Sequence, residues 1–417
     1  MGHAHESCAP GERHYGLDWL RIAAFALLIL YHIGLFFAPG VWLVKTPHPS
    51  AAIAWPMLTL EPWRLALLFV VSGYASHALL ARTSGLSEFL RARSYRLLLP
   101  LAFGVLVIVP PETWIGMVEN HGYSQSLVHF WTSDWLGFRT LNGVLLPATE
   151  HLWFVGYLWT YTMVLGAALA LATPAWKRMG RALMDWLCVD HRLIWVPLLP
   201  ILALRIAVLF TVPETHGLLH DWVSDVTYVP AFLFGFALAG HPQAWRAVHR
   251  SRLCAVLLAA ISLLILVQIQ SRFPGGVVSR THWVQALDRD SGVVMAWAMI
   301  LLLLGAAHQW LDRDHSLRPK LAEAVFPFYL AHQTIIVATA WRLKDKGLQL
   351  PFLFLILTLV TFAGCWAFYE VGRRTGRMRM LFGLSNAAVA KPHSRARPGS
   401  SFLPWISSDR PGRESLR

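Results

Sequence analysis

The chain has 417 residues, of which 56% are hydrophobic and only 14% charged, and its mean hydropathy is +0.48. An average soluble domain carries about 25% charged residues, so this composition excludes a disordered chain and argues against an ordinary water-soluble enzyme. The formal net charge of +13 would by itself suggest a nucleic-acid partner. Its distribution along the chain points instead to the inner face of a membrane, and no nucleic-acid partner is expected.

Ten apolar segments are candidates for membrane-spanning helices. A span needs about 20 apolar residues, because the hydrocarbon core is about 30 Å thick and a helix rises about 1.5 Å per residue. The sequence therefore predicts an all-α polytopic membrane protein with about ten transmembrane helices. The candidate segments cover residues 17–38, 57–81, 97–111, 151–172, 193–212, 226–240, 253–270, 291–310, 322–341 and 351–372.

The positions of Lys and Arg predict the orientation of these helices. If the N-terminus lies inside, most of the 36 Lys and Arg residues fall in inner loops or in the C-terminal tail. An even number of spans then places both termini in the cytoplasm. We expect a short cytoplasmic segment over residues 1–16, a membrane domain over 17–372, and a basic, largely disordered cytoplasmic tail over 373–417.

The first predicted helix carries two ionisable residues, Arg21 and His32. Ionisable groups inside a bilayer are costly, so each one is a candidate functional residue. Eleven steps place the two about 16 Å apart along the axis and on the same side of the helix, because eleven residues make about three turns. His exchanges protons near neutral pH, whereas Arg is a permanent cation suited to carboxylate or phosphate. Alternatively, both residues have only structural roles, with Arg21 extending its charge to the membrane surface and His32 hydrogen-bonded to a neighbouring helix.

The second and third predicted helices add further arginines. Arg64 stands about 12 Å along the axis from Ser72, and Ser72-Gly73-Tyr74 is a small-residue pattern that more often serves helix packing than binding. At the inner start of the third helix we expect a basic cluster able to hold the phosphates of a nucleotide-bearing donor, or simply an ordinary positive flank. This cluster comprises Arg91, Arg93 and Arg96.

Later helices contribute candidates of three kinds. His151 and Trp153 open the fourth helix at the outer interface, as an acceptor platform or an aromatic belt. Arg205 lies mid-helix near two prolines, which predicts a kinked helix lining a cavity. His332 places a second imidazole inside the ninth helix. No metal site is expected, because the pair His216 and His220 has no third ligand in the pattern.

Taken together, these residues resemble the membrane acyltransferase type 3 family. Within it they are most similar to the glucan biosynthesis protein C group, which is associated with succinylation of periplasmic glucans. The matching motifs follow the family order over about residues 15 to 372. They are Leu17-Asp18-x-x-Arg21-x10-His32, Arg64-x7-Ser72-Gly73-Tyr74, the stretch from Arg91 to Pro100, His151-Leu152-Trp153-Phe154, Pro230 to Gly235, Tyr329-Leu330-x-His332 and Phe368-Tyr369-Glu370.

The resemblance implies an enzyme of the bacterial inner membrane that moves an acyl group, succinyl or acetyl, from cytoplasmic acyl-CoA to a hydroxyl of an extracytoplasmic glycan. It implies no permanently bound cofactor, and it makes Arg21 and His32 the essential pair. We expect His32 to act as general base, with a covalent acyl-histidine as the second possibility. Substrate contacts are expected from Asp18, Arg64, Ser72, Tyr74, Arg91, Arg93, Arg96, His151, Trp153, Arg205 and His332.

Two other classes of function share some of these features. Intramembrane Arg and His residues on proline-kinked helices also suit a proton-coupled transporter or exporter of a glycan or small organic anion. The absence of a visible internal repeat and the donor-like position of the basic cluster argue against this class. A non-catalytic membrane sensor is the third interpretation, but the sequence shows no signalling domain. The oligomeric state stays open.

Overall fold

The structure, a computed structural model, describes residues 14–209, 221–273 and 282–385. The predicted N-terminal segment up to residue 13, the tail beyond residue 385, and His216 and His220 lie outside the described residues. The long helices are α1 (Tyr15–Phe37), α2 (Ala54–Leu80), α3 (Leu86–Phe103), α4 (Val109–Asn120), α6 (Trp153–Leu171), α7 (Pro174–Leu187), α8 (Arg192–Leu209), α9 (Trp222–Gly240), α10 (Pro242–Arg250), α11 (Arg252–Arg272), α12 (His282–Trp310), α13 (Arg318–Leu343) and α14 (Leu350–Arg374).

The remaining elements are short. They comprise the helical turns η1 (Ala51–Ile53), η2 (Gly104–Ile108), α5 (Leu127–His129), η3 (Phe130–Asp134), η4 (Glu150–Leu152) and η6 (Gly376–Phe382), and a hairpin of β1 (Thr140–Leu141) and β2 (Val144–Leu145). The two strands are antiparallel, with Thr140 opposite Leu145. The all-α prediction is therefore confirmed for the part of the chain that the structure describes.

Within those ranges, nine helical segments are long and apolar enough to cross a membrane. A tenth span is formed when α7 and α8, which meet at an angle of 112°, are counted together. The third span is much longer than predicted, because α3, η2 and α4 run on from Leu86 to Asn120. The predicted third span of residues 97–111 is therefore too short at both ends, and the outer loop begins at about residue 121.

Contacts between helix ends show which ends share a side of the bundle. At one side, the backbone N–H of Gly16 at the start of α1 donates to Asp312 just after α12, at 3.0 Å. At the other side, Lys344 after α13 pairs with Glu119 of α4, at 2.9 Å. The start of α1 and the end of α14 thus lie on the same side, as an even number of spans requires.

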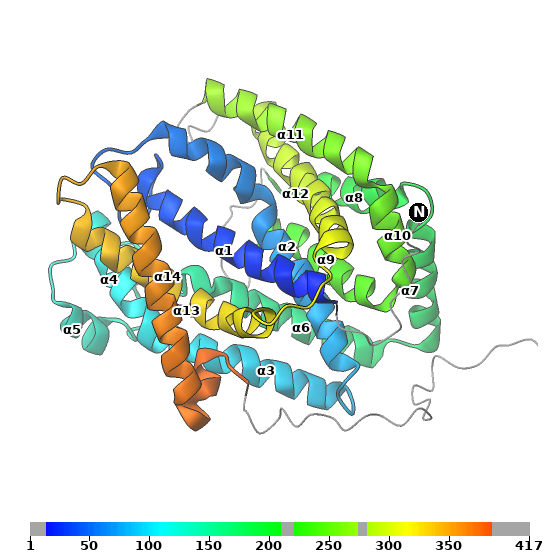
Figure 1. Cartoon of the computed structure of the whole chain (residues 1–417), viewed down its shortest axis with the longest axis horizontal. Coiled ribbons are helices and arrows are strands. Elements are labelled where there is room, and N and C mark those ends of the chain that lie inside the picture. The colour runs from blue at the N-terminus through cyan, green and yellow to red at the C-terminus, as the bar shows by residue number, and fades with distance from the viewer. Residues whose placement is uncertain (1–13, 210–220, 274–281, 386–417) are drawn as a thin grey trace, which may run out of the picture.

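Helix α1 runs through the middle of the bundle, whereas α11 and α14 lie at its edges (Figure 1). Neighbours of α1 include α2, α12 and α13. Helix α2 packs most extensively against α9. Gly73 of α2 and Gly235 of α9 allow the two backbones to come into direct contact. A Cβ at Gly73 would stand 1.9 Å from the carbonyl oxygen of Phe232, which explains the small-residue pattern as packing.

A π-helical turn, η2, joins α3 to α4 and is followed by Pro110 and Pro111. Because proline has no N–H, carbonyls one turn earlier lose their helical donors. Two tryptophans of the outer loop replace them. The indole of Trp135 donates to the carbonyl of Val105 at 3.0 Å, and that of Trp131 donates to Leu106 at 2.9 Å.

The loop that carries these tryptophans is tied together by Asp134. The hydroxyl of Tyr123 donates to its carboxylate at 2.6 Å, and Arg139 forms an ion pair with it. The hydrogen bond from Tyr123, with the nearby Arg139, holds the pKa of Asp134 below its ordinary value. This polar anchor fixes the loop against the π-helical turn.

We expect Trp135→Phe to destabilise the protein, because the phenyl ring fills only part of the buried indole site and lacks the N–H donor. A buried carbonyl left without a donor costs about 1–3 kcal/mol. The apparent melting temperature in detergent should fall, whereas the exposed Trp176 changed to Phe should leave it unaltered. Equal melting temperatures for the two variants would show that the indole hydrogen bond does not stabilise the turn.

Candidate active site

His32 of α1 is held in one tautomer by its own helix. Its Nδ1 lies 2.8 Å from the carbonyl oxygen of Leu28. A carbonyl only accepts, so Nδ1 carries the proton and the neutral ring keeps an acceptor lone pair on Nε2. That is the protonation state a general base or a nucleophile requires.

His332 of α13 is fully buried beside His32. The two rings meet edge to face with their centroids 4.9 Å apart. Nδ1 of His332 donates to the carbonyl of Tyr329 at 2.8 Å, whereas its buried Nε2 has no hydrogen-bond partner among the described residues. The predicted second imidazole is thus brought directly to the first.

His151, in η4, extends this pair to a series of three imidazoles. Its ring centroid lies 4.9 Å from that of His332. Its Nε2 lies 3.1 Å from the carbonyl oxygen of Tyr329, and its Nδ1 lies 3.2 Å from Oε1 of Glu112. Because Nε2 must donate to the carbonyl, His151 and Glu112 share one further proton between Nδ1 and the carboxyl group.

Glu112 ends the series, and the sequence analysis did not identify it. The predicted third span ended at residue 111, which left Glu112 outside the membrane. Proline is tolerated in the first turn of a helix, and Pro110 and Pro111 open α4. Glu112 is consequently inside the bundle and fully buried. The hydroxyl of Thr334 lies 3.1 Å from its Oε2 and 2.9 Å from the carbonyl oxygen of Ile108, so its one proton is shared between these two acceptors.

Arg64 of α2 lies over the ring of Tyr31, the residue before His32, with its Cζ 3.4 Å from the ring centroid. Its side chain is buried, and its Nε and Nη1 have no hydrogen-bond partner in the described ranges. Glu61 stands three residues before Arg64 in α2, a spacing that allows an ion pair on a helix, but no such pair is formed between these two described residues. The structure shows a cation–π contact instead, which is favourable for a desolvated guanidinium.

Arg21 and Asp18 connect α1 to α13 at the opposite end of the bundle. Arg21 donates to the carbonyl of Ala322 at 3.0 Å, and Asp18 pairs with Arg318 at 2.6 Å. Both Arg21 and His32 therefore face α13, as their spacing predicts. The distance of about 16 Å along the helix nevertheless keeps Arg21 away from the atoms that His32 contacts.

The predicted basic cluster lies within α3 rather than in front of the helix. Arg91 and Arg96 are exposed, but Arg93 is only 8% exposed. Nε and Nη2 of Arg93 have no partner in the part of the chain described by the structure. An ordinary positive flank is solvated, so the burial of Arg93 favours a binding role for this residue.

Comparison with known families agrees with this arrangement of residues. The acyltransferase 3 family, described as an acyltransferase domain, matches residues 14–370. The chain belongs to this family. It is therefore an integral membrane enzyme that transfers acyl groups other than amino-acyl groups, and neither the transporter nor the sensor interpretation is retained.

Several curated relatives of this acyltransferase share one name, glucans biosynthesis protein C. The protein from Escherichia coli O139:H28 is 22% identical over 343 residues, which cover 78% of this chain and 83% of the relative. The protein from Salmonella schwarzengrund is 22% identical over 405 residues, covering 94% of this chain and all of the relative. No solved structure matches the chain.

Three predicted substrate contacts of the acyltransferase lie away from its imidazoles. Ser72 is about 12 Å along α2 from Arg64. Tyr74 contacts Trp245 at the same end of the bundle as the start of α1. Trp153 follows His151 but packs against Tyr157, with ring centroids 4.9 Å apart. The structure thus brings together His32, Arg64, His151 and His332, whereas these three residues line other surfaces.

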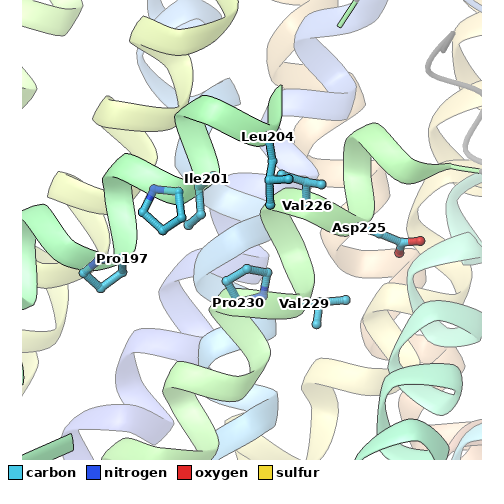
Figure 2. A pocket seen from close by; sticks show the side chains of 8 residues that line it. Pro197, Ile201, Leu204, Asp225, Val226, Val229 and Pro230 are labelled. Carbon is cyan, nitrogen blue, oxygen red and sulfur yellow. The ribbon is translucent and has the colours of Figure 1, made fainter. Parts of the chain in front are cut away.

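Arg205 also lies elsewhere, on α8, where its Nη1 donates to Thr227 of α9 at 2.8 Å. A pocket of about 450 Å³ opens between these two helices, and its side chains are shown in Figure 2. The predicted kinked helix does line a cavity, but none of the three histidines borders it. Its lining is almost entirely apolar: Pro197, Pro200, Ile201, Leu204, Asp225, Val226, Val229 and Pro230.

The Glu112→Gln variant tests the role of the carboxylate. The amide retains the shape of the side chain but removes the carboxyl group that shares a proton with His151. We expect acyl transfer to fall at least about 10-fold, within the range for lost proton-transfer groups. Glu119→Gln, on the same helix but paired with Lys344, is the matched control and should keep full activity. Full activity in Glu112→Gln would exclude the carboxylate from the reaction.

Proposed function

We propose that this acyltransferase moves a succinyl or acetyl group from cytoplasmic acyl-CoA to a hydroxyl of an extracytoplasmic glycan such as a periplasmic glucan, in the bacterial inner membrane. The name shared by the curated relatives supports a glucan acceptor. The observation that carries the proposal is the fixed tautomer of His32, which leaves an acceptor nitrogen inside the membrane region.

In this mechanism, the acceptor hydroxyl donates a hydrogen bond to Nε2 of His32. As the oxygen attacks the thioester carbon, its proton moves to Nε2, the new ester forms, and the thiolate of CoA leaves. The imidazolium then returns its proton to the thiolate or to solvent. Arg64 lies beside His32 and would disfavour a lasting charge there, which promotes release of the proton.

The donor would reach this base from the inner side. We propose that Arg93, with the exposed Arg91 and Arg96 near it on α3, binds the phosphates of CoA. Arg21 faces the same neighbouring helix as His32 and would lie along the path of the thioester arm. Arg64 would bind negative charge at the acyl end, either the distal carboxylate of a succinyl group or the oxyanion of the transition state.

Replacing His32 with Ala should lower thiol release from acetyl-CoA or succinyl-CoA by about 10²–10⁴-fold, the usual contribution of a general base. The assay uses purified protein in detergent with a mixture of soluble β-glucans, and the preferred donor of the wild type identifies the acyl group. His77→Ala, on α2 beside Gly240, is the control and should retain activity. Unchanged thiol release by a folded His32→Ala variant would exclude the base.

The proposed binding of CoA phosphates by the basic cluster is tested with the variant Arg93→Ala, and Arg91→Ala on the same helix is the control. Loss of a charge-assisted hydrogen bond to a phosphate costs about 1.5–3 kcal/mol. We therefore expect the KM for acyl-CoA to rise about 10- to 100-fold in Arg93→Ala, with little change in kcat. The exposed Arg91 should contribute much less. A fall in kcat at unchanged KM would place Arg93 outside the donor site.

A further inference from the structure

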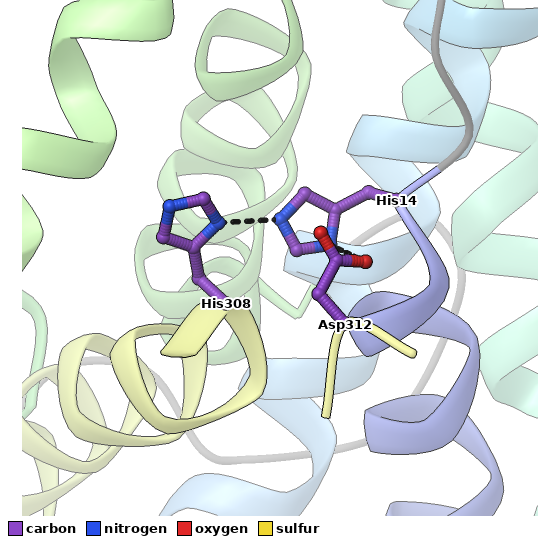
Figure 3. Close-up of side chains that lie close together, drawn as sticks. All are labelled: His14, His308 and Asp312. Atoms are coloured by element: carbon purple, nitrogen blue, oxygen red, sulfur yellow. Dashed lines mark hydrogen bonds and ion pairs between the residues drawn. The ribbon is translucent and has the colours of Figure 1, made fainter. Parts of the chain in front are cut away.

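A second cluster of ligand-forming side chains lies at the inner end of α1. His14 directly precedes α1, His308 lies in the last turn of α12, and Asp312 follows the end of that helix by two residues (Figure 3). One ligand atom from each of the three lies within 4.8 Å of the other two. In the ranges covered by the structure, this is the one group of His, Cys, Asp or Glu residues that meets this condition.

One pair of these atoms already stands at the separation expected of two ligands on one ion. Zn²⁺ binds imidazole nitrogen at about 2.0–2.1 Å, so two ligands of a tetrahedral ion lie about 3.3 Å apart. Nδ1 of His14 stands 3.4 Å from Oδ1 of Asp312, which matches this separation. The other ring nitrogen of His14, Nε2, forms a hydrogen bond of 2.9 Å with Nδ1 of His308, which His308 would exchange for the ion on binding. Nδ1 of His14 is buried and has no hydrogen-bond partner in the described part of the chain.

The surrounding residues fix the orientation of these ligands. The indole of Trp245 stacks on both imidazoles, with centroids 4.6 Å from His14 and 4.7 Å from His308. The backbone N–H of Gly16 donates to Oδ1 of Asp312. Such second-layer contacts are typical of metal sites, where they set the direction of each ligand.

Gly16 also permits the close approach that brings His14 to the end of α12. A Cβ at this position would stand 2.3 Å from the carbonyl oxygen of Ala307, so any side chain would push the two helices apart. The backbone contact between α1 and α12 therefore presents the cluster in a fixed geometry.

We propose that His14, His308 and Asp312 bind a divalent transition-metal ion. Two imidazoles and one carboxylate suit Zn²⁺ or another divalent first-row transition metal, whereas Mg²⁺ and Ca²⁺ prefer sites made of oxygen ligands. No metal site was expected from the sequence, because His216 and His220 had no third ligand; His14, His308 and Asp312 are spread over almost 300 positions and form no local pattern. The ion would fasten the start of α1, which carries Asp18 and Arg21, to the end of α12.

This site is separate from the proposed active site. His14 is 18 residues before His32 on essentially one helix, which places the two about 27 Å apart. The ion would thus stabilise the inner end of α1 without contacting the reacting atoms.

The test is titration of the purified full-length chain in detergent with Zn²⁺, by calorimetry, together with the visible absorption of added Co²⁺. All proteins carry a tag without histidine and the changes His3→Ser, His5→Ser and Cys8→Ser, which remove other metal-binding side chains near the N-terminus. Variants His308→Ala and Asp312→Asn are compared with His315→Ala, a nearby histidine outside the cluster.

We expect one Zn²⁺ per chain and a tetrahedral Co²⁺ spectrum in the background protein and in His315→Ala. Removing a ligand should weaken Zn²⁺ binding at least about 10- to 100-fold, since even second-layer changes cost that much. Asp312→Asn keeps the size of the side chain, so its loss of binding is measurable if His308→Ala fails to fold. Failure of the background protein to bind Zn²⁺, or equal binding by all variants, would overturn the proposal.

Discussion

The arrangement of the active site depends on the burial of one carboxylate, that of Glu112. A charge removed from solvent costs several kcal/mol unless its partners offset the loss, and removing one partner of a buried pair costs about 3–5 kcal/mol. Glu112 is fully buried and its partners come from two other segments, His151 before α6 and Thr334 on α13. Three spans must therefore meet at this point, and the same contact places His151 against His332. The histidine series follows from the pairing of Glu112.

That pairing in turn requires the third span to continue past two prolines. Pro110 and Pro111 cannot donate backbone hydrogen bonds, so the helix persists only because other donors reach the carbonyls of Val105 and Leu106. Both donors are indoles of the outer loop. The hydroxyl of Thr334 on α13 lies between the carbonyl of Ile108 and the carboxyl group of Glu112 and shares its one proton with them. The outer loop is thus a structural part of the active site although it contributes no residue to the histidine series.

The sequence predicted the helices and most of the imidazoles well, because both depend on local patterns. The length of each apolar segment is enough to locate a membrane-spanning helix. The spacing of Arg21 and His32 correctly predicts that the two lie on one side of α1, and in the structure that side faces α13. Spacing gives distance along an axis but not the neighbour that a side chain meets. Arg205 shows this limit: it is an intramembrane cation like the other candidates, yet its side chain donates to Thr227 of α9 and lies apart from the three histidines. Glu112 was missed because the predicted third span ended at residue 111, whereas the two prolines at that point open α4.

The partners of the arginines distinguish structural from functional positions. Arg318 is paired with Asp18 and Asp314, and Arg379 with Glu323, so these two cations connect helices at the inner side. Arg64 and Arg93 are as deeply buried as Arg318 is, yet no ion pair to either is formed among the described residues. A desolvated guanidinium without a carboxylate is unfavourable in the folded protein. On the proposed function, the anionic groups of the donor offset this cost: phosphates at Arg93 on the inner side and acyl charge at Arg64 beside His32. Two unpaired cations at different depths are what an extended donor, charged at one end and reactive at the other, requires of a membrane enzyme.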